Sequence, residues 1–471
     1  MPKKLLLIYP TLITEAPITL GMLSAVAKNM GWETKAVVNT FKEPLKIEDF
    51  VREAEDCDLV GISIITFEVL FVYEIIKALK KRGKIVIVGG AHATDKSEEC
   101  IKSGADIVIV GEGESVLEDV LKEYPNIKKG IRERKPFINL SKLPLPDLKI
   151  FDNDLFKGED GLIKGFHRIY TSRGCPGACT FCDWQIFKQC WRPYPIYKII
   201  KDIKRRIENY GIKSFSIADD CFTVDRNRAI EIAKEFKKLG IVWRTNSRAN
   251  LVDKELLEIF KDCGCHSIAF GLESGDPETL RKIGKGVNLE QNVKSPKMAH
   301  EVGLEVYGCL MTGFPWETEE NVKNQIKFVK ELWNDVSLFQ VSGSLMPFPG
   351  TAIYRQYAKQ YGFEEYWVKP KYQDFGIQVY QNALNPYKVS AFYQRYLFDD
   401  TYIQKEYFFK YTKEYKKAVR GFVLEVGKHN LEFMFPKQQK KQKIILGLSK
   451  LSMTIYDLFP ELDKGFGGYL F

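Results

Sequence analysis

Several features that would mark a secreted or membrane protein are missing from this sequence of 471 residues. No apolar run approaches the roughly 18 residues that a membrane-spanning helix needs. Residues 1–10 hold too short an apolar stretch for a secretory signal, and they fit a first β-strand instead. We therefore expect a cytoplasmic protein whose ten cysteines stay reduced or bind metal and do not form disulfides.

A large excess of one charge is also missing. The 70 lysines and arginines exceed the 61 acidic residues by 9, a modest surplus for this length. Such a balance does not point to a nucleic-acid partner. The hydrophobic fraction of 45% and the charged fraction of 28% are those of an ordinary globular protein. The length suggests about two to four domains.

Strand-like and helical segments alternate over residues 1–130. The predicted strands are short and rich in Val, Ile and Leu, as buried parallel strands are. They cover Lys4–Tyr9, Thr34–Val38, Leu59–Ile65, Ile85–Val88 and Ile107–Val110. Helical patterns separate them near Thr19–Met30, Glu68–Arg82, Lys96–Ser103 and Glu114–Glu123. This order predicts a doubly wound, Rossmann-like α/β domain that binds its ligand beyond the carboxyl ends of the strands.

Glycine and small polar residues follow three of these strands, at Ser63–Thr66, Gly89–Thr94 and Gly111–Glu114. Glycine at such places lets the backbone approach a bulky planar ligand closely. No G-x-G-x-x-G follows the first strand, which argues against a dinucleotide site. Taken alone, the domain could still have a nucleotide-binding or response-regulator-like fold.

Three further regions complete the chain. Prolines interrupt residues 131–165, which predicts a linker. Six strand–helix pairs over residues 166–365 predict a partial (β/α)6 barrel of the TIM type, with its chemistry at the carboxyl ends of the strands. Residues 366–471 carry aromatic residues and lysines at helical spacing, which predicts a mainly helical C-terminal domain. Its aromatic run at Tyr402–Phe422 and basic run at Lys437–Lys443 form either a core with a solvated face or a dock for a macromolecule or lipid headgroup.

Three cysteines, Cys175, Cys179 and Cys182, stand in a C-x3-C-x2-C arrangement after the strand-like run Phe166–Thr171. Thiolates bind iron–sulfur clusters and zinc, which usually take four ligands. This loop supplies three, so one iron of a cubic cluster would be open to another molecule. A zinc knuckle that borrows a distant ligand, or three ordinary reduced cysteines, are the alternatives. The other seven cysteines form no second set of four ligands.

This cysteine loop, at the end of a first barrel strand, resembles the cluster loop of the radical S-adenosylmethionine (SAM) superfamily. Residues 1–130 resemble the cobalamin-binding domain that precedes many radical SAM barrels. The helix entry Ala16–Gly21, the Gly-Gly-x-His segment at Gly89–His92 and the Gly-Glu-Gly-Glu segment at Gly111–Glu114 carry this likeness, and matching motifs extend to about residue 360. The resemblance implies a cobalamin-dependent radical SAM enzyme similar to the class B methyltransferases. Its cofactors would be a 4Fe-4S cluster on the three cysteines, SAM on the open iron, and cobalamin between the domains.

The resemblance also implies individual contacts, although each residue could instead serve a structural salt bridge or helix cap. Positions that match the family's SAM contacts are Asp219, Arg248, Glu273, Ser274 and Gly313. Positions implied to contact cobalamin are Thr19, Ser63, Thr66, Gly89, Gly90, His92, Gly111 and Glu112. The D-x-H-x-x-G signature that supplies a histidine to cobalt in other cobalamin proteins is absent. We therefore expect cobalamin without a protein histidine on cobalt, with His92 near the corrin edge or tail.

The activity implied is methylation of an unactivated carbon. A 5′-deoxyadenosyl radical from SAM would abstract hydrogen from an sp3 carbon, and methylcobalamin would supply the methyl group. A peptide or protein side chain is the favoured substrate, by likeness to the archaeal methylases that modify glutamine or arginine in methyl-coenzyme M reductase. Lipids and small natural products are the alternatives. An external electron donor such as ferredoxin or flavodoxin is implied, and we expect a monomer.

Two other functions stay open at this point. One is a cobalamin-dependent radical SAM enzyme that does not methylate, such as a cyclase or a lipid or natural-product enzyme. The other is a non-catalytic cobalamin or metal sensor. Methylthiolation of tRNA fits poorly, because that family's N-terminal domain carries three further cluster cysteines. Here only Cys57 and Cys100 lie in residues 1–130.

Overall fold

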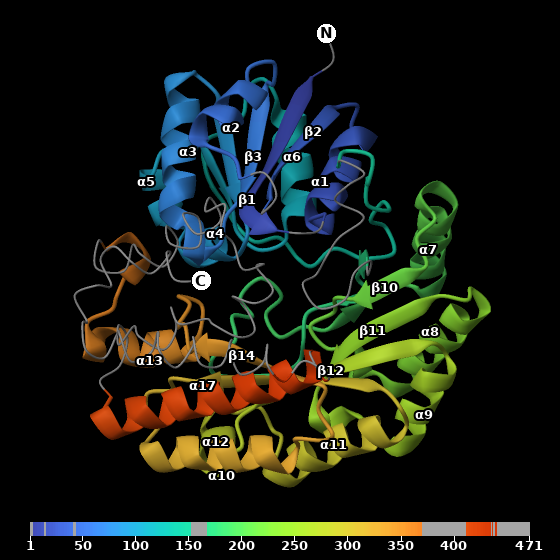
Figure 1. Cartoon of the computed structure of the whole chain (residues 1–471). Helices are drawn as coiled ribbons and strands as arrows, with labels where there is room; N and C mark the ends of the chain where they lie inside the picture. The colour runs from blue at the N-terminus through green and yellow to red at the C-terminus, as the bar shows by residue number, and fades with distance from the viewer. Residues whose placement is uncertain are drawn as a thin grey trace.

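The computed structural model describes residues 3–13, 16–40, 44–151, 167–369 and 411–434, together with residues 436 and 439. Two α/β units lie one above the other, with the N-terminal unit at the top of Figure 1 and the second unit below it. Each unit contains a six-stranded sheet in which every strand pairs in parallel with its neighbours. This arrangement confirms the α/β fold predicted from the alternation of strands and helices.

The N-terminal sheet has the strand order β2-β1-β3-β4-β5-β6. Its strands are β1 (Lys4–Ile13), β2 (Glu33–Thr40), β3 (Leu59–Ser63), β4 (Ile85–Gly89), β5 (Ile107–Ile109) and β6 (Gly130–Arg132). Its helices are α1 (Ile18–Asn29), α2 (Ile47–Glu53), α3 (Val69–Lys81), α4 (Ala91–Asp95), α5 (Ser97–Lys102) and α6 (Gly113–Glu123). A 3-10 turn, η1 (Thr66–Glu68), precedes α3.

Consecutive residues of β1 serve two different cores, as the period of a strand requires. Leu5 and Leu7 pack toward α1 and α6, whereas Leu6 and Ile8 pack toward α2 and α3. All four side chains are at most 3% exposed. Burial on both faces explains why this strand is a continuous apolar run, which is the pattern that identified it in the sequence.

The sixth strand corrects the predicted boundary between domain and linker. Gly130–Arg132 forms β6 at the sheet edge, pairing with β5, whereas the sequence placed the linker at residues 131–165. A three-residue strand with one apolar side chain lacks the pattern of a buried strand, which is why it was missed.

The second sheet has the order β14-β13-β12-β11-β10-β7. Its strands are β7 (His167–Ile169), β10 (Ser214–Ile217), β11 (Val242–Ser247), β12 (Cys265–Glu273), β13 (Glu305–Thr312) and β14 (Leu338–Ser344). Its helices are α7 (Ile196–Tyr210), α8 (Arg226–Lys238), α9 (Lys254–Asp262), α10 (Pro277–Lys282), α11 (Leu289–Glu301), α12 (Glu319–Glu331) and α13 (Ala352–Tyr361). Two short turns, η3 (Phe222–Val224) and η4 (Ala249–Leu251), follow β10 and β11, and η5 (Tyr366–Val368) follows α13. The antiparallel pair β8 (Ser172–Arg173) and β9 (Arg192–Pro193) brackets the cysteine loop.

Capping residues explain where three of the barrel helices begin. Asp225, Asp253 and Asp276 precede α8, α9 and α10, and each carboxylate accepts a hydrogen bond from a backbone N–H in the first helical turn. Pro277 then occupies the first position of α10, where no N–H is needed. These caps end each strand-to-helix loop at a defined residue.

The linker is held on both sides. The backbone N–H of Asp147 donates to the carbonyl of Gly21 over 2.8 Å, and its carboxylate pairs with Lys28 over 2.6 Å, so the linker follows α1. On the other side, the buried Lys198 of α7 donates to the carbonyls of Leu140 and Ser141, both over 3.1 Å.

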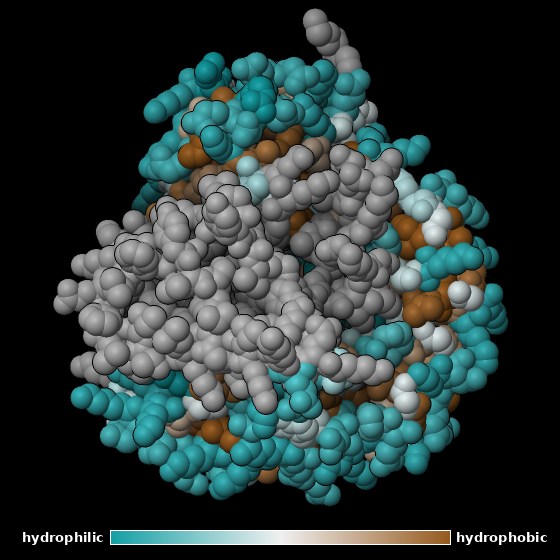
Figure 2. Space-filling model, viewed as in Figure 1, coloured by the Kyte–Doolittle hydropathy of each residue, from teal (hydrophilic) through white to brown (hydrophobic). Residues whose placement is uncertain are grey.

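The C-terminal region is described as one long helix, α17 (Lys413–Met434), which packs on α12 and on the edge strand β14 (Figure 1). The Lys437–Lys443 run and most of residues 366–471 lie outside the described residues, so the predicted helical domain stays a prediction beyond α17. No helix in the described part of the chain is long and apolar enough to cross a bilayer. Hydrophilic residues line the outer rim of both units in Figure 2, and hydrophobic residues appear along the lower margin of the upper unit.

Candidate active site between the two sheets

A cavity of about 470 Å³ lies between the carboxyl ends of the N-terminal strands and the first strand of the barrel. One wall consists of α1 and the ends of β1, β3, β4 and β5. The opposite wall consists of residues 144–146 of the linker, β7, β8 and α7. Most of the lining is apolar side chains and glycine, which suits a large, flat, mainly apolar ligand.

Six of the eight residues predicted to contact cobalamin line this cavity: Thr19, Ser63, Gly89, Gly90, Gly111 and Glu112. Two of the glycines have no room for a side chain. Gly90 has φ of 112°, and a Cβ there would lie 2.8 Å from the carbonyl oxygen of Ile64. Gly111 has φ of 84°, and a Cβ there would lie 2.7 Å from Nη1 of Arg134. Both glycines also line the cavity, so backbone without a side chain faces it at these loops, which fits a corrin.

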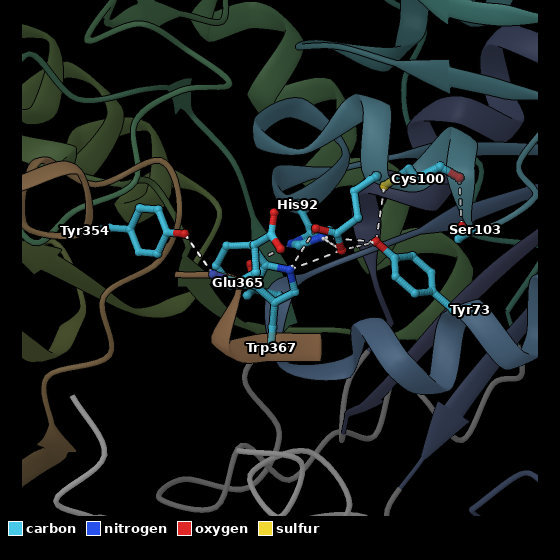
Figure 3. A network of polar contacts seen from close by, with 9 residues as sticks. Tyr73, His92, Cys100, Ser103, Tyr354, Glu365 and Trp367 are labelled. Atoms are coloured by element: carbon cyan, nitrogen blue, oxygen red, sulfur yellow. Dashed lines mark hydrogen bonds and ion pairs between the residues drawn. The ribbon is translucent and has the colours of Figure 1, made fainter. Parts of the chain in front are cut away.

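Thr66 and His92, the other two predicted contacts, do not line the cavity. His92 is fully buried, with Nδ1 3.1 Å from Oγ1 of Thr66 and Nε2 3.4 Å from the hydroxyl of Tyr73. Glu99 joins the same network by accepting from the hydroxyl of Tyr73 over 2.6 Å and from the indole N–H of Trp367 over 3.0 Å (Figure 3). The structure therefore places His92 between the N-terminal domain and the segment after the barrel, and its contact with the corrin edge or tail stays a prediction.

All five histidines lie in the described residues, and none of them lines the cavity. That a bound cobalt takes no protein histidine stays a prediction, and it can be checked by the spectrum of the loaded protein.

The cysteine loop (residues 175–182) is held by two other parts of the barrel. The N–H of Thr180 donates to the carbonyl of Ile283 over 2.9 Å, and its carbonyl accepts from the N–H of Ile353 over 3.1 Å. The loop therefore lies between the end of α10 and the start of α13. Gly174 enters it with φ of 78°, and a Cβ there would collide with the carbonyl of Cys190. Only glycine permits this entry.

Burial favours the protonated form of one of the three thiols. It raises the pKa of Cys179, although Lys285 and Arg248 nearby oppose the rise. Thiols must lose their protons to bind iron, so assembly of a metal centre here is coupled to proton release.

The three cysteines are of the residue type that binds a 4Fe-4S cluster, in which each thiolate takes a separate iron. Among the described residues, no three Cys, His, Asp or Glu side chains converge on one metal position.

Arg248 lies against the cysteine loop with part of its guanidinium unused. A Cβ on Gly177 would lie 2.5 Å from Nη1 of Arg248. The Nε atom is buried and has no hydrogen-bond partner in the described structure. A buried donor of this kind beside the cluster fits the carboxylate of SAM.

Glu273 and Lys285 form a buried ion pair at the end of β12, with 2.5 Å between Oε1 and Nζ. Glu273 has φ of 61°, which is uncommon for a residue other than glycine and clusters at functional sites. Lys285 also donates to the carbonyl of Gly271 over 2.6 Å. The sequence identified Glu273 but missed Lys285, although the Gly-Lys-Gly run at 284–286 was a visible signal of close backbone approach. The neighbouring Ser274 is 1% exposed, and its hydroxyl accepts from the N–H of Asp276.

Asp219 accepts hydrogen bonds from the segment that leads into the cysteine loop. Its carboxylate accepts three hydrogen bonds of 2.6 Å, from the N–H and hydroxyl of Thr171 and from the hydroxyl of Ser172. Burial raises the pKa of this carboxyl group. Its predicted contact with SAM stays a prediction, and the geometry favours an anchoring role instead.

Gly313, after β13, takes part in a hydrogen-bond network that the sequence did not predict. Its N–H donates to Oε2 of Glu317 over 2.7 Å and lies 3.0 Å from the hydroxyl of Tyr415, which donates to the same carboxylate over 2.8 Å. Burial raises the pKa of Glu317 to about 7. Because Tyr415 belongs to α17, the C-terminal helix reaches a loop predicted to bind SAM.

Comparisons with known proteins agree with this geometry. The family model for the B12 binding domain matches residues 14–121, and that for the radical SAM superfamily matches residues 169–329. An uncharacterized methyltransferase of Pyrococcus horikoshii is 30% identical over 366 residues, which cover 72% of this chain and 78% of that protein. The cytidylyl-2-hydroxyethylphosphonate methyltransferase of Streptomyces wedmorensis is 26% identical, covering 78% of this chain and 82% of that protein.

The fold is also that of a solved structure, the cobalamin-dependent S-adenosylmethionine radical enzyme OxsB with aqua-cobalamin and S-adenosylmethionine bound. The TM-score is 0.64 at 16% identity, covering 98% of this chain and 81% of that chain. With the two matched domains, the cysteine loop and the glycine-lined cavity, the cofactors are a 4Fe-4S cluster, SAM and cobalamin. The chain therefore belongs to the cobalamin-dependent radical SAM methyltransferases.

Proposed function

We propose that this enzyme methylates an unactivated sp3 carbon, and that the carbon belongs to a peptide or protein side chain. One observation carries the proposal. The cavity that fits cobalamin and the loop that fits the cluster share a wall, because Ser172 and Arg173 line the cavity and Cys175 follows within three residues. A carbon placed at this wall could face both cofactors.

When bound, the cofactors supply a 5′-deoxyadenosyl radical and a methyl group on cobalt. The chain's own residues bind and orient. The loops at Gly90 and Gly111 bring backbone to the corrin, and Arg248 and Glu273 would hold the polar ends of SAM. An external electron donor, ferredoxin or flavodoxin, would reduce the cluster, and the enzyme would act as a monomer.

The choice of substrate rests on the likeness to methylases that modify methyl-coenzyme M reductase. The Streptomyces relative is named for a small phosphonate substrate, which makes a small molecule the main alternative. A non-catalytic sensor is no longer needed to explain the sequence, since the chain belongs to an enzyme family. A cyclase that does not methylate is kept as an outcome of the test.

The test uses the full-length protein with its cluster reconstituted anaerobically, SAM carrying a deuterated methyl group, and lysate from a strain that lacks the gene. We expect one protein to gain a deuterated methyl group on a carbon, together with 5′-deoxyadenosine. Label confined to small molecules or lipids would overturn the peptide assignment. Production of 5′-deoxyadenosine without any labelled product would overturn methylation and favour a cyclase.

A further inference from the structure

We propose that a buried ion cluster between the two domains positions the corrin against the iron–sulfur cluster. This interdomain ion cluster consists of Glu112, Glu114, Arg173 and Arg192. Its members are positioning residues, because they act through the two loops that hold the cofactors. The inference depends on the cofactors and not on which substrate is methylated.

Arg173 is the centre of the interdomain ion cluster. Its guanidinium donates to Oε1 of Glu112 over 2.8 Å, to Oε1 of Glu114 over 2.5 Å and to the hydroxyl of Tyr194 over 2.8 Å. The side chains of Arg173, Glu112 and Glu114 are 11%, 6% and 8% exposed. Although burial raises the pKa of Glu114, Arg173 holds it below its usual value, so the pair is ionised. Hydrogen bonds between such charges fix direction as well as distance.

Arg192 adds a second connection from the partner strand. It donates to Oε1 of Glu112 over 2.7 Å and to the carbonyl of Ile138 in the linker over 3.1 Å. Its guanidinium also lies 4.2 Å from the ring centre of Phe137. Because Arg173 and Arg192 face each other across β8 and β9, both strands that bracket the cysteine loop contact the cobalamin domain.

The barrel side of this contact is rigid. Arg228 donates to the carbonyl of Thr171 over 2.7 Å, and Asp219 accepts from the N–H of the same residue over 2.6 Å. Thr171 and Ser172 are at most 1% exposed. A displacement of Glu112 and Glu114 would therefore be passed to Arg173 and on to Cys175, two residues later.

On the cobalamin side, the path from the interdomain ion cluster to the cavity is equally short. Glu112 and Glu114 alternate with Gly111 and Gly113, and all four residues line the cavity. Replacing a buried ion pair by apolar groups often costs little stability, so stability alone does not explain why charges are used here. A fork of charged hydrogen bonds between the two cofactor loops does explain the use of charges, since such a fork fixes the relative orientation of the loops.

The test measures this orientation directly by electron paramagnetic resonance. A reduced 4Fe-4S cluster and cob(II)alamin each carry unpaired spin, and their magnetic interaction depends steeply on separation. In the full-length protein loaded with both cofactors, we expect a resolved interaction. In Glu114→Gln and in Arg173→Lys the magnetic interaction should be lost or broadened, with the iron and cobalamin contents unchanged. The double variant should be no worse than Arg173→Lys alone, because that change already disturbs the connection that Glu114→Gln removes.

Asp106→Asn is the matched control. Asp106 is a carboxylate 7% exposed that pairs with Lys80 over 2.5 Å inside the N-terminal domain, so it crosses no domain boundary. This variant should keep the wild-type interaction. A wild-type interaction in Glu114→Gln would overturn the proposal. So would a loss of iron or cobalamin in that variant that matches the loss of interaction, because the pair would then be a folding element only. No substrate is used, so the result is independent of the methyl acceptor.

Discussion

The side-chain amide of Asn430 pairs with the backbone of Phe339 as a neighbouring strand would. Its Nδ2 donates to the carbonyl of Phe339 over 2.7 Å, and its Oδ1 accepts from the N–H of Phe339 over 3.0 Å. Both residues are fully buried. Phe339 lies in β14, the edge strand of the barrel sheet as far as the structure describes the chain. One residue of α17 therefore satisfies both backbone groups of Phe339 at this edge.

Asn430→Ala should therefore lower the free energy of unfolding by about 2–5 kcal/mol, since two buried backbone groups lose their partner. Denaturant unfolding measures the change. Glu432→Ala is the control, because Glu432 lies on the same helix with its side chain exposed, and its loss should cost roughly 0.5 kcal/mol or less. Equal stabilities of the two variants would contradict the pairing.

Glu317 should make stability depend on pH in the direction opposite to most carboxylates. Its pKa is about 7 in the folded protein against 4.5 for the ordinary group. Between these values the folded state binds a proton that the unfolded state releases, so the free energy of unfolding falls as pH rises from 4.5 to 7. The total loss is on the order of 3 kcal/mol.

Glu317→Gln, which imitates the protonated acid, should flatten this slope. Unfolding midpoints at the two ends of that pH window check it for each protein. Glu320→Gln, at an exposed position of α12, should keep the wild-type slope. A wild-type slope in Glu317→Gln would show that Glu317 does not titrate in this range.

Gly90→Ala should weaken cobalamin binding, because a Cβ would press on the backbone of Ile64 and displace the loop after β4. Gly83→Ala separates this effect from backbone strain. Gly83 has φ of 72° with open space around it, so alanine there should cost only the roughly 1–2 kcal/mol of a left-handed residue. Titration with hydroxocobalamin measures both variants. Equal affinities would remove the Gly90 loop from the corrin site.

Cys179→Ala should abolish cluster assembly and SAM cleavage while cobalamin stays bound to the N-terminal domain. Iron content, 5′-deoxyadenosine and the cobalamin spectrum report the three properties separately. Cys263→Ala, at a buried thiol at the end of α9, should keep all three. SAM cleavage by Cys179→Ala would refute the assignment of the cysteine loop.

The elements predicted well from the sequence are those determined by residues that lie close together in the chain. Strands such as Leu59–Ser63 are buried on both faces and appear as apolar runs, and the cysteine loop has a spacing that few other sites share. The rule that ligands bind at the carboxyl ends of parallel strands pointed to the loops at Gly90 and Gly111, and the resemblance to cobalamin-binding domains implied the individual contacts. Six of those eight residues lie in the cavity wall.

The contacts that the sequence did not predict join distant segments. His92 lies in α4, directly after the glycines at 89 and 90, and its partners Tyr73 and Trp367 come from α3 and from the segment after the barrel. Tyr415 reaches Gly313 across 102 positions of sequence, and no local pattern encodes such a pairing. Asp219 was placed at the correct strand end, yet only the three-dimensional structure shows that its acceptors are occupied by Thr171 and Ser172.

Because the linker is held by both domains, its contacts bear on whether the cobalamin domain can be transferred alone to another protein. Asp147 pairs with Lys28 of α1, and the carbonyls of residues 140–141 accept hydrogen bonds from Lys198 of α7. The connecting segment is therefore part of both domains. A chimaera that joins the first 130 residues to a foreign barrel would leave Lys28 and the carbonyl of Gly21 without Asp147, their partner in the linker. The unit to exchange in such a chimaera is therefore the domain pair together with its connection.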